Sequence, residues 1–308
     1  MSNVSLILAT SQFATSADPA RNAAQMMRQI DEAALLGADL IHFPEACLAG
    51  YAGHDLASYA GYDWAALRKE TAAVAAHIGR AGIWAVFGSA HPLSGTHKPH
   101  NALYVIDGQG RLIDRYDKRF CAGDETEGEG DLAHYTPGDH VCVFSVKDVC
   151  IGTLICHEYR YPELYRDYQR RGAQVILHSF HSGNIAPSRF AAMERAVGME
   201  NHVLNCATTI AGITQLSAVP AAAADNHLWI SCSNSSAPRS CWPAFVVRPD
   251  GVVTGRLEPE QPGLLLTEID PRKAYYDSTR AWRQRAMDGV LHSGTLVDDP
   301  RSKARQIF

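Results

Sequence analysis

The stretch VCIGTLICHEYRYPELYRDYQRRGAQVILH, residues 149–178, places an apolar run on each side of a segment with helical character. Val149–Ile155 and Gln174–His178 are short and rich in β-branched residues, which is typical of buried strands. Between them, Pro162–Arg171 begins with proline and ends before Gly172, and these residues favour the first and last turns of a helix. Strand, helix and strand in this order predict a βαβ unit and an α/β fold.

The same alternation recurs along the rest of the chain. Further strands are predicted at Val4–Ala9, Ala38–Phe43, Ile83–Gly88 and His202–Ala207, and further helices at Pro19–Leu36, Trp64–Ile78 and Pro187–Asn201. Two segments with Asp-Gly turns, residues 101–118 and 245–257, predict hairpins at matching places in the two halves. We therefore expect two sheets covered by helices in one domain, residues 1–270. A polar tail, residues 271–308, is expected on the surface or at an oligomer interface.

The composition is that of an ordinary globular protein. Of the 308 residues, 46% are hydrophobic and 20% are charged, and the formal net charge is −5. These values exclude a disordered or collagen-like chain. The weak acidic balance predicts neither a nucleic-acid partner nor an anionic membrane partner. A small molecule is the expected ligand.

Eight cysteines are spread along the chain, and no two of them have CxxC spacing. The sequence therefore predicts neither a zinc ribbon nor a thioredoxin-like redox pair. The first residues, MSNVSLILATSQF, lack the basic start of a signal peptide, and the longest apolar runs are too short to cross a bilayer. We expect a cytoplasmic protein with free thiols.

Three residues with reactive side chains lie at the ends of predicted strands. Cys156 follows Val149–Ile155, Glu45 follows Ala38–Phe43, and Lys118 ends the first hairpin. Taken singly, they could be a small buried thiol, a loop carboxylate and a surface lysine. Together they supply the parts of nucleophilic catalysis, because a thiol needs a base and its tetrahedral adduct needs a cation near the oxyanion.

Four motifs in order make the sequence resemble the nitrilase, or carbon–nitrogen hydrolase, superfamily over residues 4–270. They are Pro44-Glu45 with Gly50-Tyr51, Tyr116-x-Lys118, Gly152-x-x-Ile155-Cys156 ahead of Arg160-Tyr161-Pro162-Glu163, and Arg195-Ala196 with Glu200-Asn201. The resemblance implies a four-layer α-β-β-α sandwich that assembles into homodimers or larger homo-oligomers. It also implies a Glu-Lys-Cys triad and no metal or organic cofactor.

The resemblance further implies a role for each triad residue. Cys156 would attack the carbon of a small linear amide, carbamoyl compound or nitrile, and Glu45 would act as the general base. Lys118 would stabilise the oxyanion, with the backbone N–H of His157 as a second donor. Ammonia or an amine would leave a thioester on the cysteine, and water would then release the acid.

Other site residues are also implied. Members of the superfamily carry a further glutamate a few residues before a Pro-Gly turn, here Pro137-Gly138; the usual register falls on Asp131, and Glu129 is the alternative. The pair after the cysteine, His157-Glu158, lacks the tryptophan of many nitrile-cleaving members and so favours an amide or carbamoyl substrate. Tyr51, His178 and His181 are expected in the pocket wall.

Several alternatives stay open at this point. A nitrilase, or an acyl or amidine transferase, would use the same fold and triad. A catalytically silent relative acting as a binding module is disfavoured, because all three triad residues are present. A metal-dependent phosphoesterase would need ligands from residues 138–140, 178–181 and 225–227, whose spacing fits no two-metal pattern.

Overall fold

The computed structural model describes residues 5–123, 128–181, 210–237 and 242–306. The helices are α1 (Pro19–Leu35), α2 (Trp64–Ala81), α3 (Pro162–Arg170), α5 (Ile210–Asn226), α6 (Arg283–Met287) and α7 (Pro300–Lys303). The strands are β1 (Leu6–Phe13), β2 (Leu40–His42), β3 (Trp84–His91), β4 (His100–Ile106), β5 (Leu112–Asp117), β6 (Val143–Val146), β7 (Val149–Ile155), β8 (Val175–Ser179), β9 (Trp229–Ser235), β10 (Phe245–Val247), β11 (Val253–Arg256) and β12 (Gly263–Ile269). The chain divides into two compact units, Met1–Tyr275 and Tyr276–Phe308, and the second contains α6 and α7.

The strands of the first unit form a mixed sheet in the order β5-β4-β3-β2-β1-β9-β8-β7-β6, with β12 beside β1 and the β10–β11 hairpin beside β9. Within each half the central strands are parallel, β1 with β2 and β3, and β7 with β8 and β9. The halves join where the ends of β1 and β9 pair, Gln12 with Asn234 and Phe13 with Ser235. Each half thus has parallel strands whose carboxyl ends can carry functional residues.

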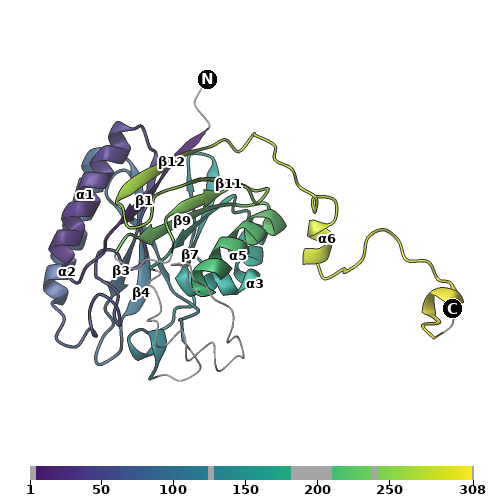
Figure 1. Cartoon of the computed structure of the whole chain (residues 1–308), viewed down its shortest axis with the longest axis horizontal. Helices are drawn as coiled ribbons and strands as arrows, with labels where there is room; N and C mark the ends of the chain where they lie inside the picture. The colour runs from purple at the N-terminus through teal and green to yellow at the C-terminus, as the bar shows by residue number, and fades with distance from the viewer. Residues whose placement is uncertain (1–4, 124–127, 182–209, 238–241, 307–308) are drawn as a thin grey trace. The chain divides into compact units, whose positions relative to one another are not determined.

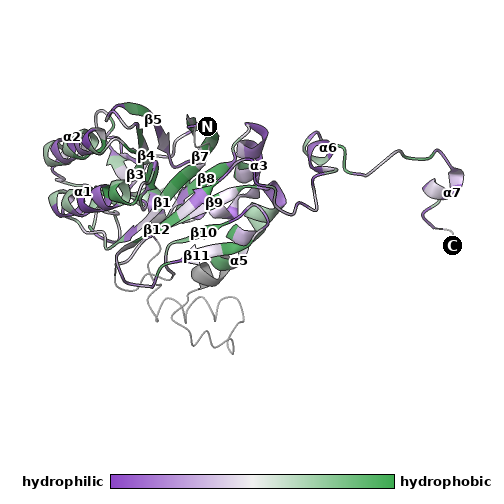
Figure 2. Ribbon diagram, turned by 90° about the horizontal axis from the view of Figure 1, so that it is seen from above, coloured by the Kyte–Doolittle hydropathy of each residue, from purple (hydrophilic) through white to green (hydrophobic). Residues whose placement is uncertain are grey.

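Helices cover both outer faces of the curled sheet. Figure 1 shows α1 and α2 on one side and α3 and α5 on the other. Figure 2 shows the strands between these two helical layers, with β7 and β8 largely hydrophobic. The predicted four-layer α-β-β-α arrangement is confirmed.

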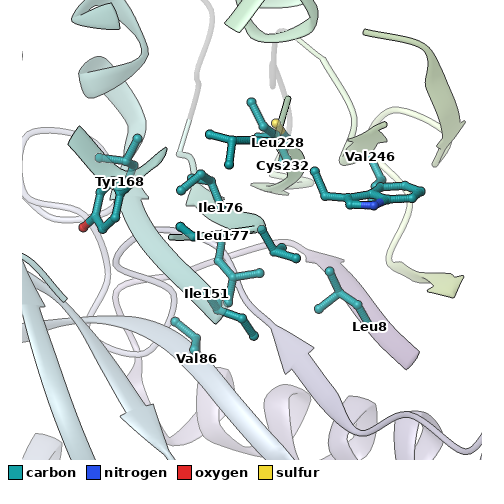
Figure 3. Packing of buried hydrophobic residues seen from close by; sticks show 14 of the residues in the cluster. Leu8, Val86, Ile151, Tyr168, Ile176, Leu177, Leu228, Cys232 and Val246 are labelled. Carbon is teal, nitrogen blue, oxygen red and sulfur yellow. The ribbon is translucent and has the colours of Figure 1, made fainter. Parts of the chain in front are cut away.

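The layer between the sheet halves is a hydrophobic core. Leu8 and Val86 from the first half belong to the same buried cluster as Ile151 and Leu177 from the second, and Figure 3 shows them converging. A second cluster packs α1 and α2 against the outer face of the first half. Burial on both faces explains why the central strands read as apolar runs.

Several elements differ from the sequence prediction because buried polar residues interrupt the apolar pattern. The first strand continues past Ala9 to Phe13, since Thr10 and Ser11 find buried partners in Ser231 and Gln29 at 2.7 and 2.6 Å. On the side away from β7, β8 pairs with β9, which follows α5. The sequence did not predict this strand because its serines interrupt the apolar pattern. The predicted helix Pro187–Asn201 and strand His202–Ala207 lie outside the described residues.

Candidate active site

Glu45 lies in the loop that follows β2, and its side chain is fully buried. Its Oε1 accepts hydrogen bonds from Asn101 Nδ2 at 2.7 Å and from Lys118 Nζ at 2.8 Å. Its Oε2 is buried with no hydrogen-bond partner among the described residues. The loop can lie this close to β3 because Gly88 has no Cβ. A Cβ there would lie only 2.3 Å from the Ala46 nitrogen. One carboxylate oxygen is therefore held in place while the other stays available.

Lys118 follows β5 and is also fully buried. Its Nζ donates to Glu45 Oε1 and, at 2.7 Å, to Asp131 Oδ2. The backbone at Lys118 is held by Gly138, whose N–H donates to the Lys118 carbonyl at 2.8 Å. This close approach requires glycine, because a Cβ at Gly138 would lie 2.5 Å from Asp117 Cβ. The Pro-Gly turn noted in the sequence thus fixes the position of the lysine.

Asp131 is the fourth charged or reactive group of the cluster. It also accepts hydrogen bonds from the Ala122 N–H at 2.7 Å and from the Tyr51 hydroxyl. Glu129, the alternative left open by the sequence, is exposed. Burial works against both charged forms, but the pairing outweighs it: Asp131 and Glu45 raise the pKa of Lys118 well above its usual value, and Lys118 holds the pKa of Asp131 below its own.

Cys156 follows β7 and adopts a left-handed backbone conformation, with φ of 42°. Few non-glycine residues occupy this region, and strain of this kind clusters at functional sites. The conformation is supported by His178, whose Nε2 lies 3.1 Å from the Cys156 carbonyl oxygen while its Nδ1 lies 2.8 Å from the Tyr165 hydroxyl. Because burial lowers the pKa of His178 to about 3, the ring is neutral and donates through one nitrogen only.

The Cys156 thiol lies within electrostatic reach of the other three groups. Burial and the charge of Glu45 raise its pKa well above the usual value, and Lys118 opposes the rise. The main-chain N–H of His181 also donates to the sulfur. The thiol is therefore protonated at neutral pH, and it needs a base when it reacts.

Glu158 is fully buried and accepts four hydrogen bonds. Oε1 accepts from the Tyr116 hydroxyl at 2.6 Å and from the Arg119 and Phe120 N–H groups at 2.8 and 3.3 Å, and Oε2 accepts from the Ile155 N–H at 2.7 Å. This carboxylate was expected in the substrate pocket. Its contacts instead tie the residues after Lys118 to the residue before Cys156.

Three other predicted pocket residues surround this cluster. Tyr51 and His181 are buried, and their rings stack with centroids 5.0 Å apart. His157 is half-buried and packs edge-on against Tyr161, and burial together with Lys118 lowers its pKa. Sequence reasoning missed Asn101, although it is the first residue of the predicted hairpin that ends at Lys118, and it missed Asp55, which lies 2.9 Å from His181 Nε2.

The residues of the phosphoesterase alternative are used differently. His140 pairs with Asp114 at 2.9 Å on the surface, and His178 is bonded to Tyr165 and Cys156. Within the described ranges no group of three or more His, Cys, Asp or Glu side chains is arranged to hold a metal ion. In the same ranges no helix has the length and hydropathy needed to span a membrane.

The family model described as carbon-nitrogen hydrolase matches residues 7–278. The chain belongs to this family. A hydrolase of Mycobacterium tuberculosis is 28% identical to this carbon–nitrogen hydrolase over 284 residues, covering 85% of this chain and 89% of that protein. A human deaminated glutathione amidase is 25% identical over 281 residues, covering 86% and 76%.

Solved structures agree on the fold. An amidase of the nitrilase superfamily from Nesterenkonia superposes with a TM-score of 0.70 at 20% identity, covering 93% of this chain and 97% of that one. A structure of the same amidase in complex with butyramide gives a TM-score of 0.69 at 21% identity, covering 93% and 97%. The predicted superfamily and the prediction of a carbon–nitrogen hydrolase are confirmed. The Arg195–Asn201 motif lies outside the described residues.

Proposed function

We propose that this carbon–nitrogen hydrolase cleaves the C–N bond of a small linear amide or carbamoyl compound through a thioester on Cys156. The observation that carries the proposal is the buried Lys118 ammonium held between Glu45 and Asp131, with Glu45 Oε2 free of other partners in the described part of the chain. This arrangement offers a fixed cation and a free base beside a strained cysteine.

In the first half of the reaction, Glu45 Oε2 takes the thiol proton as sulfur attacks the amide carbon. A proton transfer during the attack is needed because the resting thiol is neutral. The carbonyl oxygen becomes negative and is stabilised by Lys118, with the His157 N–H as the proposed second donor. Glu45 returns the proton to the nitrogen, the C–N bond breaks, and ammonia or an amine leaves a thioester.

In the second half, Glu45 takes a proton from water, and the oxygen of that water attacks the thioester carbon. The same cation again faces the oxyanion. The C–S bond then breaks, the sulfur regains its proton from Glu45, and the carboxylic acid departs. In this scheme Asp131 has a positioning part: it balances the lysine charge and holds Nζ in place through the 2.7 Å contact.

The amide substrate is favoured by the relatives, among which are a deaminated glutathione amidase and an omega-amidase from Xenopus tropicalis. The missing tryptophan after Cys156 points the same way. Of the described cysteines, six are free thiols, which supports a reducing compartment such as the cytoplasm. For the tail we keep the proposal of a homo-oligomer interface, supported by the exposed side chains of Leu291, Leu296 and Val297.

The experiment is an ammonia-release assay on a panel of small amides, carbamoyl compounds and nitriles, with and without added hydroxylamine. Wild type, Cys156→Ala and Glu45→Gln are compared at matched concentration. We expect amide or carbamoyl turnover in wild type only. Turnover of nitriles alone would establish a nitrilase, and product formation only with the added amine would establish a transferase. Ammonia release by Cys156→Ala at the wild-type rate would contradict the thioester mechanism.

A further inference from the structure

A buried histidine–aspartate pair beside Cys156 has no part in the scheme above. His181 Nε2 lies 2.9 Å from Asp55 Oδ2 and 2.8 Å from Thr15 Oγ1. The same Asp55 oxygen accepts the Tyr51 main-chain N–H at 2.9 Å and lies 3.2 Å from Thr15 Oγ1. Since the carboxylate can only accept, Nε2 carries the proton of this hydrogen bond, and the ring orientation is fixed.

The histidine is also tied to the reacting groups. Its main-chain N–H donates to the Cys156 sulfur, and its ring stacks on Tyr51 at 5.0 Å with an interplanar angle of 21°. The hydroxyl of Tyr51 bonds to Asp131, which holds Lys118. Nε2 is the ring nitrogen that faces Asp55, and Nδ1 is the one nearer the main chain of His181, which contacts the sulfur.

This second ring nitrogen is buried, yet it has no hydrogen-bond partner in another residue of the described chain. Buried polar atoms are normally paired, and two other side-chain atoms at this site, Glu45 Oε2 and Asn101 Oδ1, also lack a partner among the described residues; the first is the proposed base. Burial lowers the pKa of His181, but the hydrogen bond and charge of Asp55 outweigh it and raise that pKa above the usual value. Below this raised pKa both nitrogens carry a proton, and Nδ1 is then a donor whose nearby acceptor is the main-chain carbonyl of His181 itself rather than another described residue.

We infer that His181 Nδ1 binds a second, uncharged oxygen of the substrate, so that the enzyme selects small amides whose acyl part carries a hydroxyl or keto oxygen. The inference rests on the proposed function, since it names the substrate class of the same site. An uncharged oxygen fits the local charge balance. Three carboxylates, Glu45, Asp55 and Asp131, face two cations, Lys118 and His181, and a carboxylate on the substrate would add to the negative surplus.

Two pairs of amides of equal shape test the inference. Lactamide differs from isobutyramide, and 3-hydroxybutyramide from isovaleramide, by a hydroxyl in place of a methyl group. Turnover is measured as kcat/KM with wild type, and binding is measured by calorimetry with Cys156→Ala. We expect the hydroxylated member of at least one pair to be favoured by about tenfold or more. Succinamate, the anionic probe, is expected to show no such gain in kcat/KM or in binding over the methyl members of the pairs.

Two substitutions of His181 provide the matched comparison. His181→Gln keeps an amide group at the place of Nε2, next to Asp55, but leaves nothing at Nδ1, so the preference should fall to about onefold. His181→Asn keeps a polar group near the place of Nδ1 and should retain a preference. Equal use of both members of each pair by wild type, or a preference that survives in His181→Gln, would overturn the inference.

The two measurements separate this inference from the proposed function. Ammonia release without an oxygen preference would overturn the subsite and leave the hydrolase proposal intact. An oxygen preference in binding that disappears in His181→Gln, without turnover of any amide by wild type, would support the subsite and contradict hydrolysis. A stronger preference for succinamate would overturn the uncharged substrate class.

Discussion

The Lys118 ammonium lies 2.8 Å from Glu45 Oε1 and 2.7 Å from Asp131 Oδ2, and all three side chains are buried. One cation is thus shared by two carboxylates, and the trio carries a surplus negative charge. That surplus helps to explain why the thiol of Cys156 stays protonated: burial raises its pKa, and Glu45 raises it further. In the proposed mechanism the thiolate therefore forms only as it attacks.

Removing the lysine should damage both activity and stability. Lys118→Ala is expected to lower kcat/KM by about a hundredfold or more, as loss of an oxyanion donor does. It should also lower the free energy of unfolding by about 3–5 kcal/mol, because two buried carboxylates are left facing each other. Steady-state kinetics and urea unfolding measure the two effects. Activity within tenfold of wild type would remove Lys118 from the oxyanion site.

The two candidate carboxylates near the Pro-Gly turn should behave differently. Asp131→Asn removes the charge that balances Lys118, and we expect kcat to fall by about tenfold or more, since a buried charge loses its partner. Glu129→Gln changes an exposed side chain and should leave kcat near the wild-type value. Measuring kcat of both variants in the same assay decides which residue is the fourth carboxylate of the site. A larger loss of kcat in Glu129→Gln than in Asp131→Asn would assign that role to Glu129.

Glu158 is expected to act through position rather than contact with substrate. Glu158→Gln replaces an acceptor of four hydrogen bonds by a group with one acceptor oxygen, which should cost about 1–3 kcal/mol of stability. Displacement of Lys118 relative to Cys156 should lower kcat while KM changes little. Glu32→Gln, an exposed change on α1, is the control. A variant with a raised KM and an unchanged kcat would place Glu158 in the substrate pocket instead.

These residues show where sequence reasoning succeeded and where it stopped. Cys156, Glu45 and Lys118 follow strands β7, β2 and β5, so strand prediction was enough to suggest that they meet. The partners of Glu158 could not be predicted, because its hydrogen bonds join backbone groups of segments about 40 residues apart. β9 was missed for a related reason: its buried serines find partners such as Thr10 and Ser11, which are distant in the sequence.

The His181–Asp55 pair gives a pH dependence of stability. The charge of Asp55 outweighs burial and raises the folded-state pKa of His181 above 6.5, while His54 and Glu45 also face this ring. A raised pKa means that the contribution is fully present below pH 6.5 and is lost as pH rises through the folded-state value. The difference in Tm between wild type and His181→Gln should therefore shrink as the pH rises above 6.5. A difference that grows over this range would contradict the charged pair.

The most direct test of the proposed chemistry is the intact mass of the protein during turnover. Wild type and Cys156→Ala are mixed with a substrate found in the ammonia assay, quenched in acid within the first turnovers and weighed by mass spectrometry. We predict an adduct on wild type equal to the substrate mass less ammonia, and none on Cys156→Ala. An equal adduct on both proteins would contradict the thioester mechanism. So would ammonia release at the same rate by wild type and Cys156→Ala.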